Sequence, residues 1–268
     1  MKKILPICLS LLFCSCSSVP TNDITADETL KKAIKWYRNS AEKKALYLQI
    51  FSMGYQYIYA TIKKLGLKPK TWGVVLDMDE TVLDNSAIYF KFSNCFDGPD
   101  IDQPTFEKTV TIHGKANALP GAVELTKKIH ELGGYVSFVT NRDGSYKDAE
   151  GNTLDKVVET LRNNGIYFDQ VILANYRDCA SPTDTDKNPR FKAIEDGNYN
   201  PKLMIWSNTL PPHKIIAYFG DNIHDFPCLK QADIVTKDGN SKEFDKFGHG
   251  FFILPNPMYG SWEENYYE

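Results

Sequence analysis

The sequence has no hydrophobic run long enough to cross a bilayer and no excess of basic residues. Its longest apolar-leaning stretch, from Ile4 to Phe13, holds ten residues, whereas a membrane-spanning helix needs about 20. Without Lys2 and Lys3 at the start, 29 basic residues stand against 34 acidic ones. This balance leaves no electrostatic footprint for a nucleic-acid polymer, so we expect no nucleic-acid groove. Internal repeats and low-complexity tracts are also absent.

Cysteine is scarce beyond the first residues. Three of the six cysteines lie within residues 1–16, which leaves Cys95, Cys179 and Cys228. An odd number excludes complete pairing, and CxxC spacing is absent. In an oxidising compartment, two of these three cysteines can form one disulfide. We do not expect a catalytic thiol.

The N-terminus predicts a lipoprotein signal peptide. The basic Met1-Lys2-Lys3 precedes the short apolar run, which is typical of a segment removed after secretion. Phe13-Cys14-Ser15-Cys16 resembles a bacterial lipobox, with Phe where Leu is usual, and Cys16 would carry the lipid. Ordinary secretion with cleavage after Ser17 or Ser18 is the alternative. We expect a signal peptide over residues 1–16, a tether over 17–27 and one domain over 28–268, anchored by lipid at the outer membrane or cell surface, on the periplasmic or extracellular side.

Two carboxylates at the end of a predicted strand are the main functional signal. Gly73-Val74-Val75-Leu76 suits a buried strand and leads directly into Asp77 and Asp79. Side chains spaced by two point to the same face of a strand, and open α/β sheets bind ligands at the carboxyl ends of their strands. Two acids held so close are costly unless a metal ion or an incoming charge lies between them. The pair therefore indicates an active site rather than packing.

The rest of the chain alternates between strand and helix patterns. This alternation predicts an α/β fold with a parallel sheet and right-handed crossovers. A helical region over residues 27–65, with an apolar stripe from Leu48 to Leu65, precedes the first strand. We predict strands at 74–78, 135–140, 170–173 and 215–220, candidate edge strands at 232–235 and 251–254, and helices at 120–132, 153–164 and 187–196.

Two segments do not fit the alternation. Residues 86–119 lie between the first strand and its helix and are rich in aromatic side chains. An insertion at this edge of a sheet can cover the site and exclude water. Residues 201–213 have two open interpretations. They form either an extra strand with a turn or a loop that contacts a partner.

Phosphoryl transfer needs a nucleophile, an acid for the leaving oxygen and positive charge around the phosphate. Asp77 would be the nucleophile and form an aspartyl-phosphate, while Asp79 would protonate the leaving oxygen and later deprotonate a water. A dianionic phosphate approaches ionised carboxylates only beside a hard cation, for which Mg²⁺ is the default. Asp221 would be a further metal ligand, Asp225 would hold the metal's waters, and the backbone carbonyl of Asp79 is a plausible extra ligand.

Phosphate-binding groups follow at other strand ends. Thr140 and Asn141 can donate hydrogen bonds to phosphate oxygens, and Lys187 would supply a fixed positive charge. Arg142 is a weaker candidate, because it could simply pair with a neighbouring acid. Each feature alone also fits ordinary turn or helix-cap chemistry. Their ordered occurrence on successive strands favours a phosphoryl-transfer site.

Four segments stand out together: 77–85, 138–142, Lys187 followed by Arg190, and 220–226. They resemble the four motifs of the haloacid dehalogenase (HAD) superfamily, and within it the class C (lipoprotein) bacterial acid phosphatases. The likeness continues in Trp36-Tyr37, in Leu119-Pro120-Gly121-Ala122 and in the tail over 254–262. It covers nearly the whole chain after the signal peptide.

The resemblance implies a Rossmann-like parallel sheet with helices on both faces and a small, mostly helical cap from the N-terminal region and the insertion. It implies Mg²⁺-dependent hydrolysis of phosphomonoesters at acid pH, often nucleoside 5′-monophosphates, and homodimers are common in the family. Asp79 fits the phosphatase members, because ATPase members commonly carry Thr there. Members clamp the substrate between two aromatics: Tyr259 matches the one in the tail, whereas the insertion position that is often Trp aligns with Ile101.

Two other functions stay open at this point. A phosphotransferase would use the same site but pass the phosphoryl group to an alcohol acceptor. A non-catalytic, surface-binding lipoprotein could reuse the fold, since a fold does not fix a function.

Overall fold

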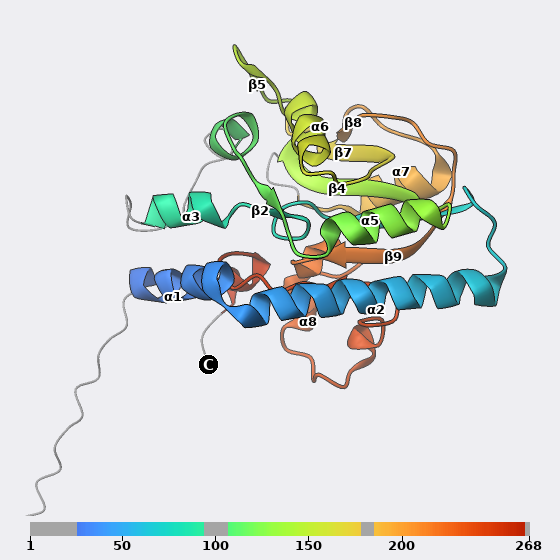
Figure 1. Ribbon diagram of the computed structural model, residues 1–268, viewed down its shortest axis with the longest axis horizontal. Helices are drawn as coiled ribbons and strands as arrows, with labels where there is room; N and C mark the ends of the chain where they lie inside the picture. Colours follow the sequence, from blue (N-terminus) through green and yellow to red (C-terminus); the bar gives the residue numbers. More distant parts are fainter. Residues whose placement is uncertain (1–25, 94–106, 178–184, 266–268) are drawn as a thin grey trace, which may run out of the picture.

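A six-stranded sheet forms the centre of the protein (Figure 1). The computed structural model describes residues 26–93, 107–177 and 185–265. Five neighbouring strands are parallel, and the last is antiparallel to its neighbour. In spatial order they are β10 (Phe251–Ile253), β9 (Lys214–Gly220), β1 (Trp72–Leu76), β4 (Tyr135–Asp143), β7 (Gln170–Ala174) and β8 (Met204–Trp206). The predicted parallel α/β sheet is confirmed.

Both faces of the sheet are buried, which explains why its strands are apolar runs rather than alternating patterns. Every residue of β1 is buried. Val74 and Leu76 pack into the core on one face, whereas Val75 packs into the core on the other. The strand therefore contributes to both cores, and its direction at Asp77 is fixed from both sides.

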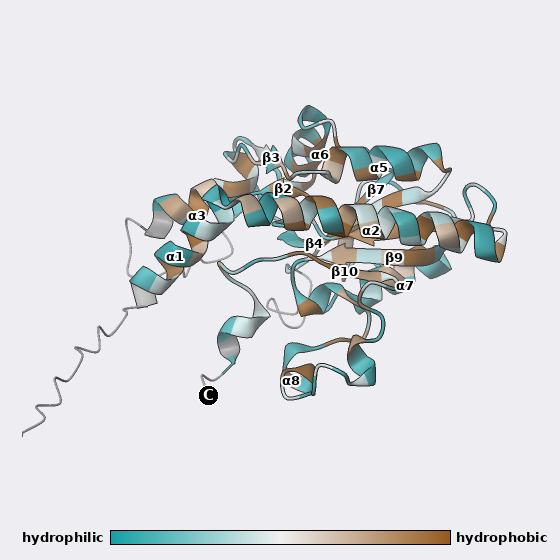
Figure 2. Cartoon of the chain, turned by 60° about the horizontal axis from the view of Figure 1, so that its bottom comes forward, coloured by the Kyte–Doolittle hydropathy of each residue, from teal (hydrophilic) through white to brown (hydrophobic). Residues whose placement is uncertain are grey.

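Helices cover the two faces unequally (Figure 2). Among the described helices, α2, α5 and α6 pack on the first face of the sheet, α7 packs on the second, and α1 packs beside α2. Their bounds are α1 (Ala26–Asn39), α2 (Ala41–Leu65), α5 (Ala122–Glu131), α6 (Thr153–Asn163) and α7 (Asn188–Asp196). Among the described residues, no helix combines the length and apolarity that crossing a bilayer requires.

The buried stripe of α2 differs from the predicted one. Leu48 and Leu65 of that prediction are about half exposed, at 54% and 49%. Phe51 and Ile58 of the predicted stripe are buried, and the buried face includes Gly54 and continues toward the start of the helix through Lys43 and Tyr47. A Cβ at Gly54 would lie 2.4 Å from the ring of Phe219, so a small residue lets α2 approach the sheet closely.

The insertion after β1 is partly helical. It contains β2 (Leu83–Asp84), α3 (Ser86–Ser93), the π-helix η1 (Glu107–Ile112) and β3 (Asn117–Ala118), with β2 and β3 antiparallel. A second small hairpin, β5 (Lys147–Asp148) with β6 (Gly151–Asn152), follows β4. Short helices complete the chain: η2 (Ile223–Asp225), α8 (Gln231–Ile234), η3 (Lys242–Phe244) and η4 (Ser261–Glu264).

Two edge predictions are resolved by the structure. The strand expected at 232–235 is wrong, because α8 occupies that segment. Only Ile234 is buried there while Val235 is 46% exposed, so the segment has no alternating buried face to pair with a sheet. The segment 201–213 holds a strand, β8, which closes the other edge against β7.

Candidate active site

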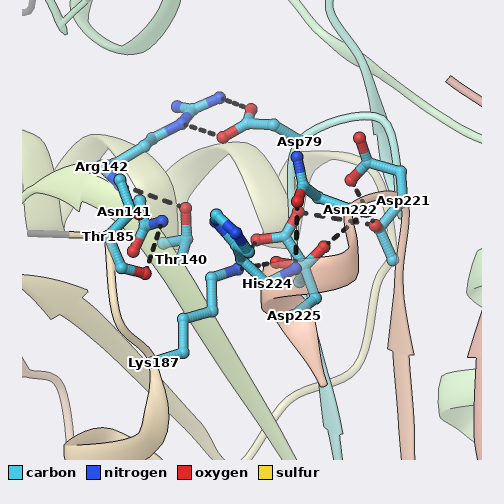
Figure 3. Close-up of polar contacts among 12 residues, drawn as sticks. Asp79, Thr140, Asn141, Arg142, Thr185, Lys187, Asp221, Asn222, His224 and Asp225 are labelled. Carbon is cyan, nitrogen blue, oxygen red and sulfur yellow. Dashed lines mark hydrogen bonds and ion pairs between the residues drawn. The ribbon is translucent and has the colours of Figure 1, made fainter. Parts of the chain in front are cut away.

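Three carboxylates meet at the carboxyl end of the sheet, and Figure 3 labels two of them, Asp221 and Asp225. Asp77 follows β1 and Asp221 follows β9, and these strands are parallel neighbours with Leu76 opposite Phe219. Asp225 comes from η2, the turn of helix directly after β9. Within the described chain, Asp77, Asp221 and Asp225 each offer one carboxylate oxygen, and these oxygens all lie within 4.8 Å of one another.

Local geometry holds Asp225 in this cluster. The side chain of Asn222 accepts a hydrogen bond from the backbone N–H of His224 at 3.0 Å, and the N–H of Asn222 donates to Oδ2 of Asp225 at 2.9 Å. A Cβ at Gly220 would lie 2.3 Å from the Cβ of Asp225. Glycine is therefore required for the strand to pass so close to this acid.

Lys187 is the cation of the cluster. It lies at the start of α7 with 2% exposure, and its Nζ contacts Asp77 and lies 2.6 Å from Oδ1 of Asp225. Burial alone would lower the pKa of Lys187, but the carboxylates of Asp225 and Asp77 raise it above its usual value. The ammonium group therefore stays charged between two acids.

The carboxylates outnumber this cation. Burial raises the pKa of Asp77 to about 7; Lys187 opposes this shift, and Asp225 and Asp79 add to it. Burial, followed by repulsion from Asp225 and Asp77, raises the pKa of Asp221 well above its ordinary range. A divalent cation would compensate this excess negative charge, and a purely oxygen donor set suits a hard one. The residues present thus fit a metal site.

Asp79 faces a different partner. Arg142 forms two hydrogen bonds with its carboxylate, from Nη2 to Oδ1 at 2.6 Å and from Nε to Oδ2 at 3.1 Å. The amide of Asn85 donates to Oδ1 at 2.6 Å. The predicted metal role of Asp79 therefore rests on its backbone carbonyl and not on its carboxylate. Asp225, predicted to hold only the metal's waters, places its own carboxylate among the candidate ligands.

Thr140 and Asn141 are fixed by Arg190, a buried residue of α7. Arg190 donates to the backbone carbonyl of Thr140 and to the side-chain oxygen of Asn141. The amide nitrogen of Asn141 donates to the carbonyl of Thr185 at 3.2 Å. The side chain of Asn141 and the backbone at Thr140 are thus held in place in the last part of β4.

All eight residues to which we assigned a role within the domain line one cavity of about 410 Å³. Arg142, the weaker candidate, lines it too. Six further residues line the cavity to which sequence reasoning gave no role: Tyr176, Thr185, Asn222, His224, Gly260 and Ser261. The last four of these lie in the segments 220–226 and 254–262 that carry the resemblance. Tyr176 could have been found, because it follows β7 at the same sheet edge.

Known proteins with this arrangement identify the family. The model of the HAD superfamily, subfamily IIIB (acid phosphatase), matches residues 10–262. The chain belongs to this family. The chain is also similar to the crystal structure of the class C acid phosphatase from Bacillus anthracis with tungstate bound. The two share 27% sequence identity with a TM-score of 0.69, and the match covers 89% of this chain and 88% of that one. A second structure of the class C acid phosphatase from Bacillus anthracis gives 27% identity, TM-score 0.68, and coverage of 88% and 87%.

Membership of this acid phosphatase family decides between the classes of function. The protein is a phosphomonoesterase, so the non-catalytic alternative is set aside. HAD enzymes generally use a divalent metal, which agrees with the cluster of Asp77, Asp221 and Asp225.

Tyr259 of the acid phosphatase has an aromatic neighbour that we did not expect. Its ring stacks on Tyr89 of α3, with centroids 4.5 Å apart and planes at 20°. Its hydroxyl donates to the carboxylate of Glu80, which is fully buried and has a pKa raised to about 8, chiefly by burial. Ile101, the residue aligned with the usual Trp, lies outside the described residues.

The cysteines add little to the acid phosphatase site. Cys228 is exposed and has no disulfide partner among the described residues. Cys95 and Cys179 lie outside them, so the possibility of one disulfide among the three stays open.

Proposed function

We propose that this acid phosphatase hydrolyses phosphomonoesters through a phosphoryl group carried on Asp77, with Mg²⁺ as its cation. The observation that supports it is the contact of Asp77 with Lys187 inside a cavity that also holds the carboxylates of Asp221 and Asp225. A nucleophile beside a fixed cation and a metal-binding set is what phosphoryl transfer requires.

The reaction proceeds in two displacements. A carboxylate oxygen of Asp77 attacks phosphorus while the bond to the leaving oxygen breaks, and Asp79 gives that oxygen a proton. Asp79 then takes a proton from a water that attacks the phosphorus, which releases inorganic phosphate and restores Asp77. Lys187, Thr140 and Asn141 hold the phosphate oxygens during both steps. Asp77, Asp221, Asp225 and the carbonyl of Asp79 would hold Mg²⁺, which would supply the positive charge that lets an anionic substrate approach.

Nucleoside 5′-monophosphates are the substrates we propose. Tyr259 lines the cavity beside the phosphate-binding groups and presents an aromatic ring. Stacking of a base on such a ring contributes about 1–3 kcal/mol, enough to favour nucleotides over simple alkyl phosphates.

The sequence supports a lipid-anchored enzyme at the outer membrane or cell surface, on the periplasmic or extracellular side. We propose that Cys16 carries the lipid and that residues 17–27 tether the catalytic domain, which we expect to form homodimers. Cys16→Ser should release the enzyme into the soluble fraction. Recovery of this variant in the membrane fraction would contradict the anchor.

The test of the mechanism is Asp77→Asn, which keeps shape and removes the nucleophilic charge. Turnover of an aryl phosphate should fall by at least about 10³-fold, because the covalent step is lost. Circular dichroism should stay unchanged. Acid quenching of the wild type should trap a phosphoenzyme that the variant lacks, chelation should abolish activity, and Mg²⁺ should restore it. Retained turnover in the variant would exclude the covalent route, and phosphate transfer to added alcohol in place of water would favour a phosphotransferase.

A further inference from the structure

Arg142 directs its guanidinium group toward protein partners on two sides. It is 2% exposed, and Nε and Nη2 hold both oxygens of Asp79 (Figure 3). The third nitrogen, Nη1, donates to the hydroxyl of Thr111 at 3.0 Å. A planar fork matches a carboxylate in this way, which a lysine cannot reproduce.

Thr111 links Arg142 to a buried acid in the insertion. While its hydroxyl accepts from Arg142, it donates to Oε2 of Glu107 at 2.7 Å. The other carboxylate oxygen of Glu107 accepts from the backbone N–H of Asp143, the residue after Arg142 on β4. Glu107 and Thr111 are 0% and 2% exposed. The π-helix η1 thus contacts the side chain of Arg142 through Thr111, and it contacts the backbone of β4 next to Arg142 through Glu107.

Hydrogen bonds join Asp79, Arg142, Thr111 and Glu107 in one continuous line. A buried guanidinium needs partners that satisfy its donors, since an unpaired buried charge is strongly destabilising. With Glu107 and Thr111 on the far side, Arg142 can hold Asp79 without shifting toward the cavity. A chain of hydrogen bonds also strengthens each member through polarisation.

We propose that Arg142 is a positioning residue for Asp79, fixed from behind by Thr111 and Glu107 of the insertion, and is not a phosphate ligand. This rests on the proposed function, in which Asp79 protonates the leaving oxygen. The insertion then sets where the proton donor lies. A misplaced donor matters most when the leaving oxygen is a poor leaving group, because that oxygen needs its proton early.

The experiment compares kcat/KM for two substrates, a nitro-substituted aryl phosphate with a good leaving group and an alkyl phosphate with a poor one. The variants are Arg142→Lys and Thr111→Val, with Thr111→Ser as the matched control that keeps the hydroxyl. Asp79→Asn measures the full effect of losing the donor. Inhibition by inorganic phosphate reports phosphate binding separately.

For the alkyl phosphate we expect kcat/KM to fall about 10–100-fold in Arg142→Lys and about 3–10-fold in Thr111→Val, because general acid catalysis contributes about 10²–10⁴-fold. The aryl phosphate should change by less than about 3-fold, which also shows that the variants fold, and phosphate inhibition should not change. Thr111→Ser should resemble the wild type on both substrates.

Equal losses on both substrates in Arg142→Lys, together with weaker phosphate inhibition, would overturn the proposal and make Arg142 a phosphate ligand. Wild-type behaviour of both Arg142→Lys and Thr111→Val would overturn it as well. The proposed function fails in a different way: Asp79→Asn itself would then affect the two substrates equally.

Discussion

The ammonium of Lys187 lies 2.6 Å from the carboxylate of Asp225 and also contacts Asp77. One buried cation therefore bridges Asp77, the proposed nucleophile, and Asp225. Lys187 stands on the face of the sheet opposite α2, at the start of α7, so it approaches the cluster from a different layer than β1 does. Its charge partly offsets the repulsion that the three acids would otherwise exert on one another and on a phosphate.

Lys187→Gln should lower kcat by about 10²–10³-fold, the usual effect of removing one donor aimed at developing charge. Removing the partner of buried charges should also destabilise the fold by about 3–5 kcal/mol. Steady-state kinetics and thermal unfolding measure the two effects. Lys187→Arg is the control, since it keeps the charge while changing its shape. A Gln variant with wild-type kcat would show that Lys187 serves packing alone.

The buried acids also predict how the stability of the metal-free enzyme depends on pH. Burial is the main cause that raises the pKa of Asp77 and Glu107 to about 7 and of Glu80 to about 8. Unfolding returns these groups to ordinary values of 3.8 for Asp and 4.5 for Glu. The folded state thus binds more protons between these limits, so their contribution to stability is complete below about pH 4 and is lost as pH rises toward 8.

With chelator present, the unfolding temperature should therefore fall between pH 5 and pH 8. His213, whose pKa burial lowers, acts in the opposite sense, but it is one group against several. Mg²⁺ should reduce the fall, because it binds the ionised carboxylates and replaces the protons they lose. Glu107→Gln should flatten the profile in both conditions. A chelated enzyme that becomes more stable across this pH range would contradict the prediction.

The site residues whose meeting at one edge the sequence predicts are those that the sheet positions. Asp77 and Asp221 follow parallel strands, and strand direction alone brings such residues to one edge. Lys187 precedes a helix, and the Pro and apolar residues of that helix predict where it lies in the chain. Local pattern and strand order were sufficient here, because a buried parallel sheet leaves few ways to arrange its ends.

The parts that sequence reasoning missed depend on contacts between distant segments. The pairing of Arg142 with a neighbouring acid is one of the two roles that the sequence leaves open for it, and the structure shows Asp79 as that acid. Its link through Thr111 to Glu107 was missed, because the position of η1 follows from no periodicity. Tyr89 likewise reaches Tyr259 only through the path of α3. The segment 232–235 failed for a related reason: a run of four residues suits a strand or a helical turn equally, and neighbouring β10 already occupies that sheet edge.

The stack of Tyr89 on Tyr259 gives a prediction about substrate choice. Tyr259→Leu should raise KM for a nucleoside 5′-monophosphate by about 5–150-fold, the equivalent of 1–3 kcal/mol of lost base stacking. An alkyl phosphate, which has no base, should be affected only slightly. Tyr259→Phe is the matched control, because it keeps the ring and removes only the hydroxyl that contacts Glu80.

Tyr89→Leu should produce a smaller change in the same direction, since the ring of Tyr259 would lose the neighbour that holds its plane. Steady-state kinetics with both substrates at saturating Mg²⁺ measures these effects. If Tyr259→Leu lowered kcat/KM equally for the nucleotide and the alkyl phosphate, the ring would serve the fold of the tail and not the base. The nucleotide preference would then have to reside elsewhere in the cavity, and Tyr176, which follows β7 and also lines the cavity, would be the next aromatic to test.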